Sequence, residues 1–369
     1  MLDFHRADLA RLAARDRLRV LAPMAGKDFA SNDYLGLANS PRLAAAMARA
    51  IEQGVPVGSG GSRLLRGNHP EHEALEAEAA AFFGAEASLY FSSGYTANVA
   101  IMATLPQRGD LIVHDALVHA SMHEGMTLSR ATSVAAAHND AGAFEQAIRT
   151  WRAQGGKGTV WIAVESLYSM DGDTAPLADL YAVAERHDAM LVVDEAHATG
   201  VFGDRGQGLS SPSERVVTLH TCGKAMGCEG ALVAGPAILR DYLVNRGRGF
   251  IFSTAPSPLM ARGVRESLRI LADEPERRAA LNARIALAGE HLARHGALAN
   301  GTPIMPLILG DNGRTMRAAQ ALQARGFDIR GIRPPTVPVG AARLRLSITL
   351  NVEAADILAL DQALQEVLA

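Results

Sequence analysis

Residues 216–235 read VVTLHTCGKAMGCEGALVAG. Two short apolar runs in this stretch, at 216–221 and 230–235, have the length and composition of buried strands. A segment of small residues with a single lysine, Lys224, separates them. The same kind of run recurs along the chain as SLYFSS, LIVHD, TVWIAVES and MLVVDEAH, with segments typical of helices in between. Strands joined by helical crossovers predict an α/β fold with a mainly parallel sheet covered on both faces.

The two ends of the chain predict further parts. Residues 3–20 have the pattern of an amphipathic, Arg-rich helix. After about residue 255, a helical stretch (258–295) leads to PIMPLILG, a second helix (313–325) and the strand-like ARLRLSITL. This order indicates a smaller α+β domain. We therefore expect an N-terminal helix and arm at 1–40, a large domain at 41–255 that contains the strands and Lys224, and a small C-terminal domain at 256–369.

Two helix boundaries carry local signals. Pro41 follows a turn-rich segment and suits the first position of a helix. The helical run EHEALEAEAAAFFG ends in Gly84, which suits a helix C-terminus because glycine adopts the left-handed conformation readily. We therefore expect one helix to begin at Pro41 and another to end before Gly84.

Composition and charge restrict the class of protein. Hydrophobic residues make up 48% of the 369 residues and charged residues 20%, and the formal net charge is -3. This balance gives no electrostatic case for nucleic acid or an anionic membrane as the main partner. The charged N-terminus does not resemble a secretory signal, and no apolar run is long enough for a transmembrane helix. The two cysteines, Cys222 and Cys228, form no disulfide framework, so we expect a cytoplasmic protein.

Polar residues at strand ends are the first candidates for a site, because ligands of parallel sheets bind there. In FSSGYTAN (91–98), Gly94 and Tyr95 open a helix whose N–H groups could bind an anion, although the motif taken alone favours a plain strand-to-helix turn with a serine cap. In LIVHDALVHASMHEG, His119 could lay its ring on an aromatic cofactor. No cysteine or carboxylate pair completes a zinc-ligand spacing with His114 or His123, so we expect no metal.

Asp194 ends an apolar strand, and His197 follows it in a turn. A carboxylate at this place needs a positive partner, which a protonated cofactor nitrogen would supply, although a capping aspartate with a hydrogen-bonded histidine is the alternative. Lys224 does not belong to a phosphate-clamp motif, because Thr218 stands where that motif has glycine and Ala225 where it has serine or threonine. A partly desolvated lysine is a good nucleophile toward a carbonyl, which favours a Schiff-base role.

These features fit one cofactor, pyridoxal 5′-phosphate (PLP). A PLP site needs a Schiff-base lysine, an acidic partner for the pyridine nitrogen and an anion pocket for the phosphate. Lys224, Asp194 and the Gly94–Tyr95 turn supply these groups, in the order pocket, aspartate, lysine along the chain. The combination is more specific than any of its members.

The chain resembles the α-oxoamine synthases, a PLP-dependent family of fold type I. The motifs that carry the resemblance span nearly the whole chain in collinear order: SNDYLGL (31–37), GSGGSRLLRGNHPEHEALE (58–76), FSSGYTAN, VHASMHEG, ESLYSMDGDTAPL (165–177), VVDEAHATGVFG, TCGKAMG, FIFSTAPSP and IRPPTVPVGAARLRLS. The resemblance implies the aspartate aminotransferase-like fold and an active site shared within a homodimer. It implies cofactor contacts from Gly94, Tyr95, His119, Ser169, Asp194, His197, Thr221, Lys224, Ser253 and Thr254.

The implied catalytic residues are Lys224, His119, Asp194 and His197. Lys224 would bind PLP covalently and move the proton of the substrate, and Asp194 would pair with the pyridinium nitrogen. His119 would stack on the PLP ring, and His197 would form a hydrogen bond to the phenolic oxygen of PLP. Ser169 would lie beside the ring.

The resemblance also implies contacts to the phosphate and to the substrates. Ser253 and Thr254 would reach the phosphate of the neighbouring subunit. Arg345 would bind the carboxylate of the amino acid, a task that suits a planar guanidinium. Arg19 and Thr336 match positions that bind the acyl substrate, and Asn32 with Tyr34 would form the wall near the dimer interface.

Within the family, GSGGSR and IRPPTVP are most similar to the members of biotin biosynthesis. The implied reaction joins L-alanine to a pimeloyl thioester, on acyl-carrier protein or coenzyme A, with loss of CO2. Members such as 5-aminolevulinate synthase, 2-amino-3-ketobutyrate ligase and longer-chain acyl synthases would share the same Lys–Asp–His site. A PLP aminotransferase or lyase, which would not need Arg19 and Thr336, and a non-enzymatic binding protein are the remaining alternatives.

Two departures from the family pattern affect these expectations. The segment APMAGKDFA (22–30) is short where family members often have a longer β-hairpin, which bears on the acyl entrance. Cys222 stands where an aromatic residue is common, and Cys228 lies close by. We expect both cysteines to be small fillers without a redox role, because reactive thiols need specific surroundings that lower their pKa.

Overall fold

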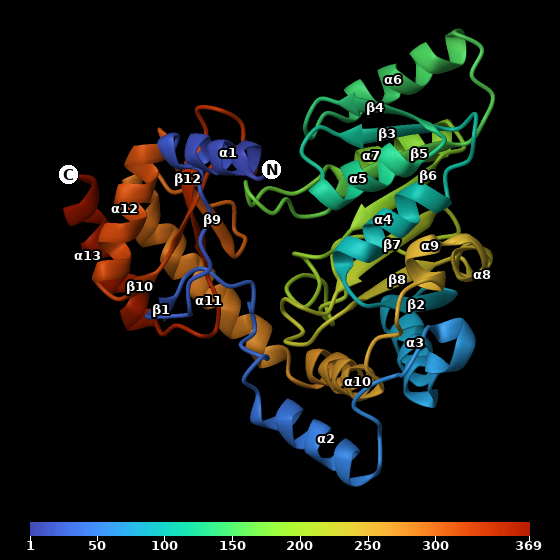
Figure 1. Cartoon of the computed structure of the whole chain (residues 1–369), viewed down its shortest axis with the longest axis horizontal. Helices are drawn as coiled ribbons and strands as arrows, with labels where there is room; N and C mark the ends of the chain where they lie inside the picture. The colour runs from blue at the N-terminus through green and yellow to red at the C-terminus, as the bar shows by residue number, and fades with distance from the viewer. The chain divides into compact units, whose positions relative to one another are not determined.

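The computed structural model describes residues 1–369 and divides into two compact units (Figure 1). The large unit comprises residues 35–168 and 174–275, and the small unit comprises residues 1–34, 169–173 and 276–369. These boundaries differ from the predicted division at residues 40 and 255, because the chain runs through the small unit three times.

Seven strands of the large unit form one sheet in the order β2-β8-β7-β6-β5-β3-β4. The strands are β2 (Ala87–Phe91), β3 (Leu111–Asp115), β4 (Thr132–Ala136), β5 (Val160–Glu165), β6 (Met190–Asp194), β7 (Val216–Thr221) and β8 (Ala231–Gly235). β8 runs antiparallel to both of its neighbours, and all other pairs are parallel. The predicted mainly parallel sheet is confirmed.

Helices cover this sheet on both faces, as its sequence predicts. Alternate residues of each strand point to opposite faces, so Ile112 and Val192 join one core cluster while Leu111 and Leu191 join the other. The first cluster includes residues of α4 (Gly94–Thr104), α5 (Ala120–Leu128), α8 (Ala237–Arg246) and α9 (Arg248–Ile251). The second includes residues of α6 (Ala141–Ala153) and α7 (Leu177–Arg186).

Three further helices of the large unit pack together beside the sheet edge at β2. They are α2 (Pro41–Glu52), α3 (Pro70–Phe83) and α10 (Pro258–Asp273), and the short π-helix η1 (Arg63–Gly67) precedes α3. Figure 1 shows α10 between α2 and α3, and both contact it. α2 begins at Pro41 as predicted, with Ser40 Oγ accepting from Leu43 N at 3.4 Å. α3 ends at Gly84, whose φ of 68° is left-handed, also as predicted.

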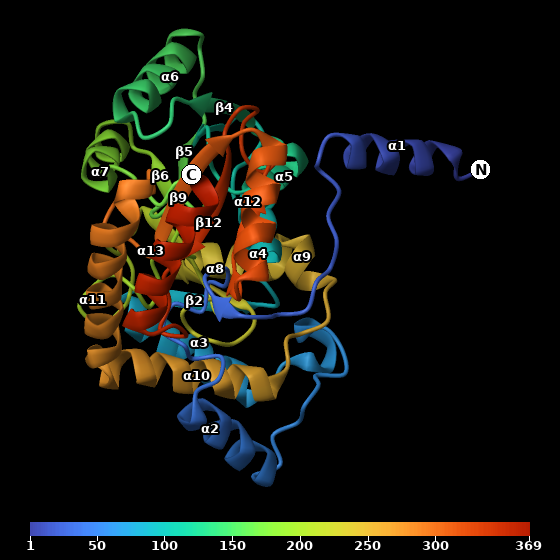
Figure 2. The same ribbon diagram turned by 90° about the vertical axis from the view of Figure 1, so that its left-hand side faces the viewer.

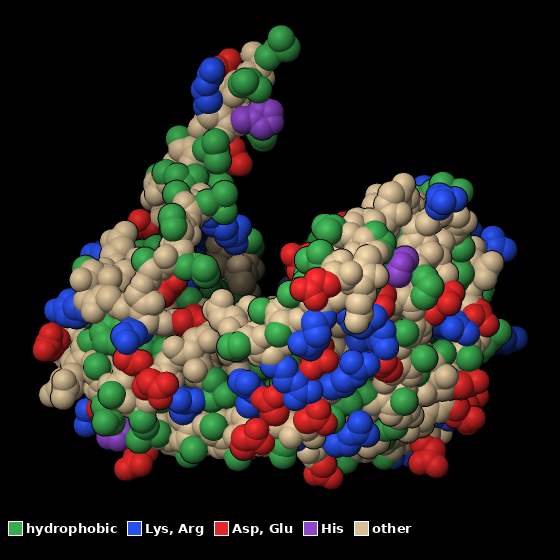
Figure 3. All heavy atoms as spheres, turned by 90° about the horizontal axis from the view of Figure 1, so that it is seen from below, with side chains coloured by type: hydrophobic (Ala, Val, Ile, Leu, Met, Phe, Trp, Pro, Cys, Tyr) green, Lys and Arg blue, Asp and Glu red, His purple; other side chains and the backbone are tan.

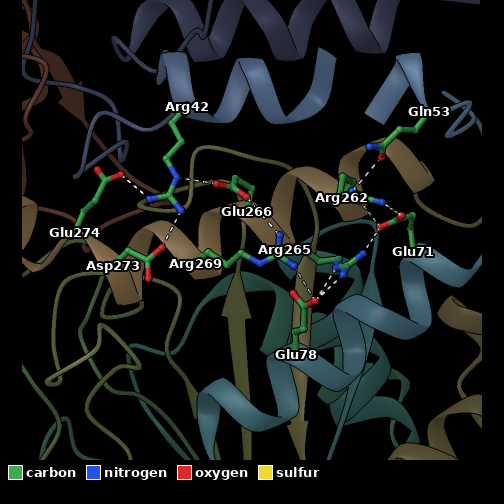
Figure 4. Close-up of polar contacts among 10 residues, drawn as sticks. All are labelled: Arg42, Gln53, Glu71, Glu78, Arg262, Arg265, Glu266, Arg269, Asp273 and Glu274. Atoms are coloured by element: carbon green, nitrogen blue, oxygen red, sulfur yellow. Dashed lines mark hydrogen bonds and ion pairs between the residues drawn. The ribbon is translucent and has the colours of Figure 1, made fainter. Parts of the chain in front are cut away.

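Ion pairs connect these three helices (Figure 4). Arg42 of α2 donates to Glu266 of α10 at 2.7 Å. Arg262 and Arg265 of α10 both pair with Glu71 of α3, and the hydrogen bond from Arg262 holds the pKa of Glu71 down at about 2, well below its usual range. The other acidic members of the network are Glu78, Asp273 and Glu274. Figure 3 shows the resulting mixture of basic and acidic side chains on the surface of these helices.

The small unit has its own antiparallel sheet, in the order β11-β12-β9, and a short parallel pair, β1 with β10. Its strands are β1 (Lys27–Asp28), β9 (Ile304–Gly310), β10 (Phe327–Asp328), β11 (Arg330–Ile332) and β12 (Ala342–Ser347). Its helices are α1 (Asp3–Ala14), α11 (Pro275–Leu292), η2 (Ala293–His295), α12 (Asn312–Ala324) and α13 (Ala354–Leu368). The predicted α+β character is confirmed.

Two helices differ from their predicted extents. The helical stretch expected at 258–295 is interrupted before Pro275, because proline has no N–H group to continue the ladder of α10. The helix expected at 3–20 ends at Ala14, buries no residue and extends away from the rest of its unit in Figure 2. None of the helices combines the length and the apolar character that a membrane-spanning segment requires.

Candidate active site

Lys224 lies in the tight loop that connects β7 to β8. The loop is closed at its base, where Cys222 N donates to Gly230 O and Cys228 N donates to Cys222 O, each at 2.8 Å. Gly227 has a φ of 62°, and a side chain there would collide with the backbone of Leu37 and Ala38. The run of small residues noted in the sequence therefore allows close packing that fixes the loop and the start of the Lys224 side chain.

The amine of Lys224 contacts His197. Lys224 Nζ lies 2.7 Å from His197 Nε2, and His197 is buried in the segment that follows β6. The two residues are 27 positions apart in the sequence, and the adjacency of β6 and β7 brings them together. A lysine amine and an imidazole at this distance share one proton in their contact.

Asp194 lies at the end of β6, and each of its carboxylate oxygens accepts a hydrogen bond. Ala196 N donates to Oδ1 at 2.9 Å, and Asn98 Nδ2 donates to Oδ2 at 2.7 Å. Asp194 therefore acts as a local cap, the alternative left open by the sequence, and is also available to a cationic partner. Asn98 was not recognised from the sequence, although it belongs to FSSGYTAN.

His119 is the N-cap of α5. Its Nδ1 accepts from Ser121 N at 3.3 Å and lies 2.8 Å from Ser121 Oγ. Burial lowers the pKa of His119, the charge of Lys224 also lowers it, and the charge of Asp194 opposes both effects. Since the ring interacts with both charges, the three predicted residues lie near one another, and His119 is neutral at pH 7. Ser121, a second residue that sequence reasoning missed, lies in the first turn of the same helix.

The predicted anion pocket lies at the start of α4. Ser93 caps this helix by accepting from Thr96 N at 3.1 Å, so the serine-cap interpretation is correct for Ser93. Gly94 lies against Thr221, since a side chain at position 94 would come within 3.5 Å of Thr221 Oγ1. Tyr95 donates to Glu124 and presents its ring at 83° to the ring of His119, with centroids 6.2 Å apart.

Ser253 and Thr254 follow α9 and line a small cavity of the large unit. Ser92, which precedes the cap of α4, lines the same cavity. Ser253 Oγ donates to Thr254 O at 3.4 Å. Both hydroxyl residues therefore lie near the strand end that leads into the predicted anion pocket.

The small unit gathers a second group of predicted residues around Arg345 of β12. Arg345 Nη2 donates to Asn32 Oδ1 at 2.9 Å, and Nε donates to Ser169 O at 2.6 Å. Tyr34 is fully buried beside them, its hydroxyl 3.5 Å from Arg345 Nη2. Burial raises the pKa of Tyr34 although the Arg345 charge opposes this, so the phenol is neutral at pH 7. Three segments far apart in the sequence thus converge on one guanidinium.

Arg19 and Thr336 also meet within the small unit. Arg19 Nη2 donates to Thr336 Oγ1 at 3.2 Å, across 317 residues of sequence. The pair that the family resemblance implied for acyl binding is therefore adjacent in space.

The two cysteines are free thiols next to the Lys224 loop. Burial raises the pKa of Cys222 well above its usual value and that of Cys228 to about 11. Both thiols are therefore protonated at neutral pH, in agreement with their expected role as fillers. No group of three or more His, Cys, Asp or Glu side chains is arranged to hold a metal ion, and His114 instead stacks edge-on against His123.

The groups of the large unit fit PLP in their chemistry. Lys224 offers a primary amine for the aldehyde, and Asp194 offers a carboxylate for a protonated ring nitrogen. His119 offers a flat neutral ring, and the N-terminus of α4 offers N–H groups beside a bare glycine for a phosphate.

Comparisons with known proteins agree with this chemistry. The family model described as aminotransferase class I and II matches residues 27–360. The 8-amino-7-oxononanoate synthase of Chromobacterium violaceum is 44% identical over 333 residues, which cover 88% of this chain and 85% of that protein. The enzyme of the same name from Azoarcus sp. is 40% identical over 383 residues, which cover 99% of this chain and 97% of that protein.

A solved structure of serine palmitoyltransferase with PLP bound as its internal aldimine has the same fold. It superposes with a TM-score of 0.90 at 26% sequence identity, covering 99% of this chain and 97% of that one. The family model, the relatives and the fold agree with the collinear motifs of the sequence. The chain therefore belongs to the class I and II aminotransferase family of PLP-dependent enzymes, as one of its α-oxoamine synthases.

Proposed function

We propose that this enzyme is an 8-amino-7-oxononanoate synthase, which condenses L-alanine with a pimeloyl thioester in biotin biosynthesis. The contact of 2.7 Å between Lys224 Nζ and His197 Nε2, beside Asp194 and His119, supports the reaction class. The relatives of that name, 40% and 44% identical, support the choice of substrates.

The residues of the large unit handle the amino group and the proton of alanine. PLP, when bound, supplies an aldehyde for the amine and a ring that withdraws electrons from the alanine Cα. The Lys224 amine removes the Cα proton and later returns it, and its contact with His197 gives that proton a defined partner. Asp194 would stabilise a positive charge on the ring nitrogen, and His119 would cover one face of the ring and exclude water from it.

The residues of the small unit bind the two substrates. Arg345 binds the alanine carboxylate through its planar guanidinium, which Asn32 and Ser169 hold in a fixed orientation. Arg19 and Thr336 bind the acyl substrate. Fixing the carboxylate orients the Cα–H bond for proton removal, which lowers the barrier by orientation.

The reaction balances when one proton is taken from water. A C–C bond forms between the alanine Cα and the thioester carbonyl, and the C–S bond breaks to release a thiolate, which takes a proton from water. The bond from Cα to the carboxylate then breaks to release CO2, and Lys224 delivers a proton to Cα. The products are 8-amino-7-oxononanoate, CO2 and the free thiol of acyl-carrier protein or coenzyme A.

We also propose that the enzyme acts as a homodimer in the cytoplasm. Ser253 and Thr254 would reach the phosphate bound to the partner subunit, as the family resemblance implies. The two free thiols suit a reducing compartment.

A substrate matrix tests the proposal. Purified holoenzyme is assayed for thiol release with L-alanine and pimeloyl thioester, glycine and succinyl thioester, and L-serine and palmitoyl thioester. The third pair is included because serine palmitoyltransferase shares the fold. We expect the first pair to be turned over at least 100-fold faster, as kcat/KM, than the others (a factor of 100 corresponds to about 2.7 kcal/mol). Preference for glycine or serine would overturn the assignment.

Replacing Lys224 tests the mechanism independently of the substrates. Lys224→Ala should retain the folded structure, bind PLP without a covalent bond and lose turnover. Covalent attachment is measured by borohydride reduction and mass spectrometry of the Lys224 peptide. Catalysis that survives in the variant would contradict the role of Lys224.

A further inference from the structure

A chain of hydrogen bonds joins Asp194 to His119 through two residues that have no assigned role. Asn98 Nδ2 lies 2.7 Å from Asp194 Oδ2 and 3.1 Å from Ser121 Oγ. Ser121 Oγ lies 2.8 Å from His119 Nδ1. Asn98 belongs to α4 and Ser121 to α5, and both are buried. The chain therefore spans the end of β6 and the starts of two helices within the large unit.

The chemistry of the groups fixes the direction of every bond. The Asp194 carboxylate accepts, so the Asn98 amide nitrogen must face it and use one of its two protons there. The second proton of Asn98 points to Ser121 Oγ, which leaves the Ser121 hydroxyl proton for His119 Nδ1. Ser121 N–H donates to the same nitrogen. His119 Nδ1 is thus an acceptor, and the neutral ring carries its proton on Nε2.

The opposite orientation of the Asn98 amide is excluded by the same reasoning. It would place the amide oxygen against the Asp194 carboxylate, where two acceptors face each other without a proton. In the observed orientation Asn98 Oδ1 is buried and has no hydrogen-bond partner. An unpartnered buried acceptor costs stability, so Asn98 is placed for its two donors and not for its contribution to the stability of the core.

We propose that Asn98 and Ser121 are positioning residues that orient Asp194 and His119 together and keep His119 neutral in its Nε2–H form. A proton on His119 Nδ1 would face the two protons that the Ser121 hydroxyl and backbone N–H already direct at this nitrogen. The chain of hydrogen bonds therefore disfavours protonation of Nδ1. A single rearrangement of Asn98 would affect both Asp194 and His119. This inference rests on PLP binding at Lys224 and does not depend on which amino acid or thioester is used.

A simpler view holds that Ser121 only completes the first turn of α5. The variant Ser121→Ala separates the two views, because it keeps the backbone N–H that donates to His119 Nδ1 and removes the hydroxyl. Ser121→Thr keeps the hydroxyl and serves as the conservative rescue. Ser40→Ala is the matched control for loss of a buried serine hydroxyl, since Ser40 caps α2 and does not touch this network.

The first measurement is the titration of His119 by NMR in protein labelled with 15N-histidine, both without and with PLP, assigned by His119→Gln. We expect the wild-type ring to show the Nε2–H pattern of nitrogen shifts at pH 7. In Ser121→Ala the midpoint of the His119 titration should rise by roughly 0.4 to 1 pH unit, the effect of one ordinary hydrogen bond. Ser121→Thr should restore the wild-type midpoint, and Ser40→Ala should leave it unchanged.

The second measurement is PLP affinity, which reports on the orientation of Asp194 at the other end of the hydrogen-bond chain. Asn98→Leu has a similar shape but no donor, so the PLP dissociation constant should rise roughly 10- to 100-fold, as for loss of a hydrogen bond to a charged group. The double variant with Ser121→Ala should show a titration midpoint that is not the sum of the single effects, because both residues belong to one chain.

Two results would overturn the inference. One is an Nδ1–H form of His119 in the wild-type protein. The other is a set of Ser121→Ala and Asn98→Leu variants that match Ser40→Ala in both measurements. Neither readout uses a substrate, so failure of the substrate assignment leaves them unaffected, and failure of this inference leaves the substrate matrix unaffected.

Discussion

The contact between Lys224 and His197 determines which proton states the pair can adopt. With Nζ and Nε2 only 2.7 Å apart, either the amine donates to the ring or the ring donates to the amine. Protonation of both groups would place two positive charges in contact, which costs energy in this partly buried site. When Lys224 gains or loses a proton at the substrate Cα, the protonation of His197 therefore responds to the change in charge.

The thiols next to Lys224 should be unreactive in the folded enzyme. A pKa of about 11 leaves roughly one Cys228 thiol in a thousand as thiolate at pH 8, and Cys222 is raised well above its usual value by full burial. We expect alkylation by iodoacetamide at pH 8 to be at least 100-fold slower than for the unfolded chain (a bound set by the thiolate fraction). Mass spectrometry of the 222–228 peptide over time measures this, with Cys228→Ser identifying the site. Rapid labelling of the native enzyme would contradict the assignment of fillers.

At the scale of one helix, Gly84 should be the residue that terminates α3. Its φ of 68° is left-handed, and a side chain would approach Pro212 Cγ at 3.1 Å. Gly84→Ala should therefore lower the free energy of unfolding by about 1–2 kcal/mol, the cost of a left-handed alanine. Urea unfolding of the variant measures the change. Gly58→Ala is the control, since a side chain there meets open space, and it should be neutral or slightly stabilising.

Two buried histidines of the large unit should make it sensitive to acid. Burial lowers the pKa of His220 from 6.5 to about 3, and burial together with the charge of Arg63 lowers that of His72 to about 4. Because these folded values lie below the unfolded value, the unfolded chain binds more protons below pH 6.5. The free energy of unfolding should therefore fall as the pH decreases from 6.5 toward 4, by about 1.4 kcal/mol per pH unit for each histidine.

The variant His220→Phe tests this acid sensitivity. The ring of His220 stacks on the ring of Phe83, with centroids 3.5 Å apart. The hydroxyl groups of Thr199 and Thr218, which contact His220, can also donate to the backbone oxygens of Glu195 and Ala234. A phenyl ring can therefore replace the imidazole without leaving these hydroxyl groups without an acceptor. We expect the slope of the unfolding free energy against pH, measured in urea between pH 4.5 and 6.5, to decrease by the contribution of one histidine, about 1.4 kcal/mol per pH unit. The exposed His5→Phe provides the control. An unchanged slope in His220→Phe would show that its titration does not limit stability.

The sequence predicted most elements because the signals are local. Six of the seven large-sheet strands were recognised from apolar runs, whereas β4 was missed because four of its five residues are exposed. The division of the 258–295 helix follows from Pro275, which is also a local signal in the sequence. The roles of Asn98 and Ser121 could not be read locally, since they depend on the approach of α4 and α5 to β6.

At the scale of the molecule, the residues proposed for cofactor and substrate belong to different units, with Ser169 as the exception, since it was predicted beside the cofactor and lies in the small unit. Lys224, Asp194 and His119 lie in the large unit, whereas Arg345 and Asn32 lie in the small unit. The passage of residues 169–173 through the small unit brings Ser169 to Arg345, and no local pattern of the sequence could predict this. Each unit therefore holds its own hydrogen-bonded group, and a mutation in the small-unit group should weaken alanine binding while leaving PLP binding by the large-unit group nearly unchanged.

Arg345→Lys tests this separation. Lysine cannot reproduce the guanidinium fork that bonds Asn32, Ser169 and a carboxylate, so we expect the KM for alanine to rise roughly 10- to 100-fold. The PLP dissociation constant, measured by absorbance titration, should stay within about twofold of wild type, because Lys224, Asp194 and His119 lie in the large unit and Ser169 offers Arg345 only its backbone oxygen (a twofold change is about 0.4 kcal/mol). Parallel weakening of PLP and alanine binding would contradict the separation.

Arg343→Lys is the matched control for that experiment. Arg343 lies two residues earlier on β12, is equally buried and donates to Met170 O at 3.0 Å, so its contacts also reach the 169–173 segment. If Arg345 binds the carboxylate itself, Arg343→Lys should lower the melting temperature to a similar extent while leaving the KM for alanine within about threefold of wild type. If both variants raise the KM equally, the loss comes from loosening of the 169–173 segment, and Arg345 has only a structural role.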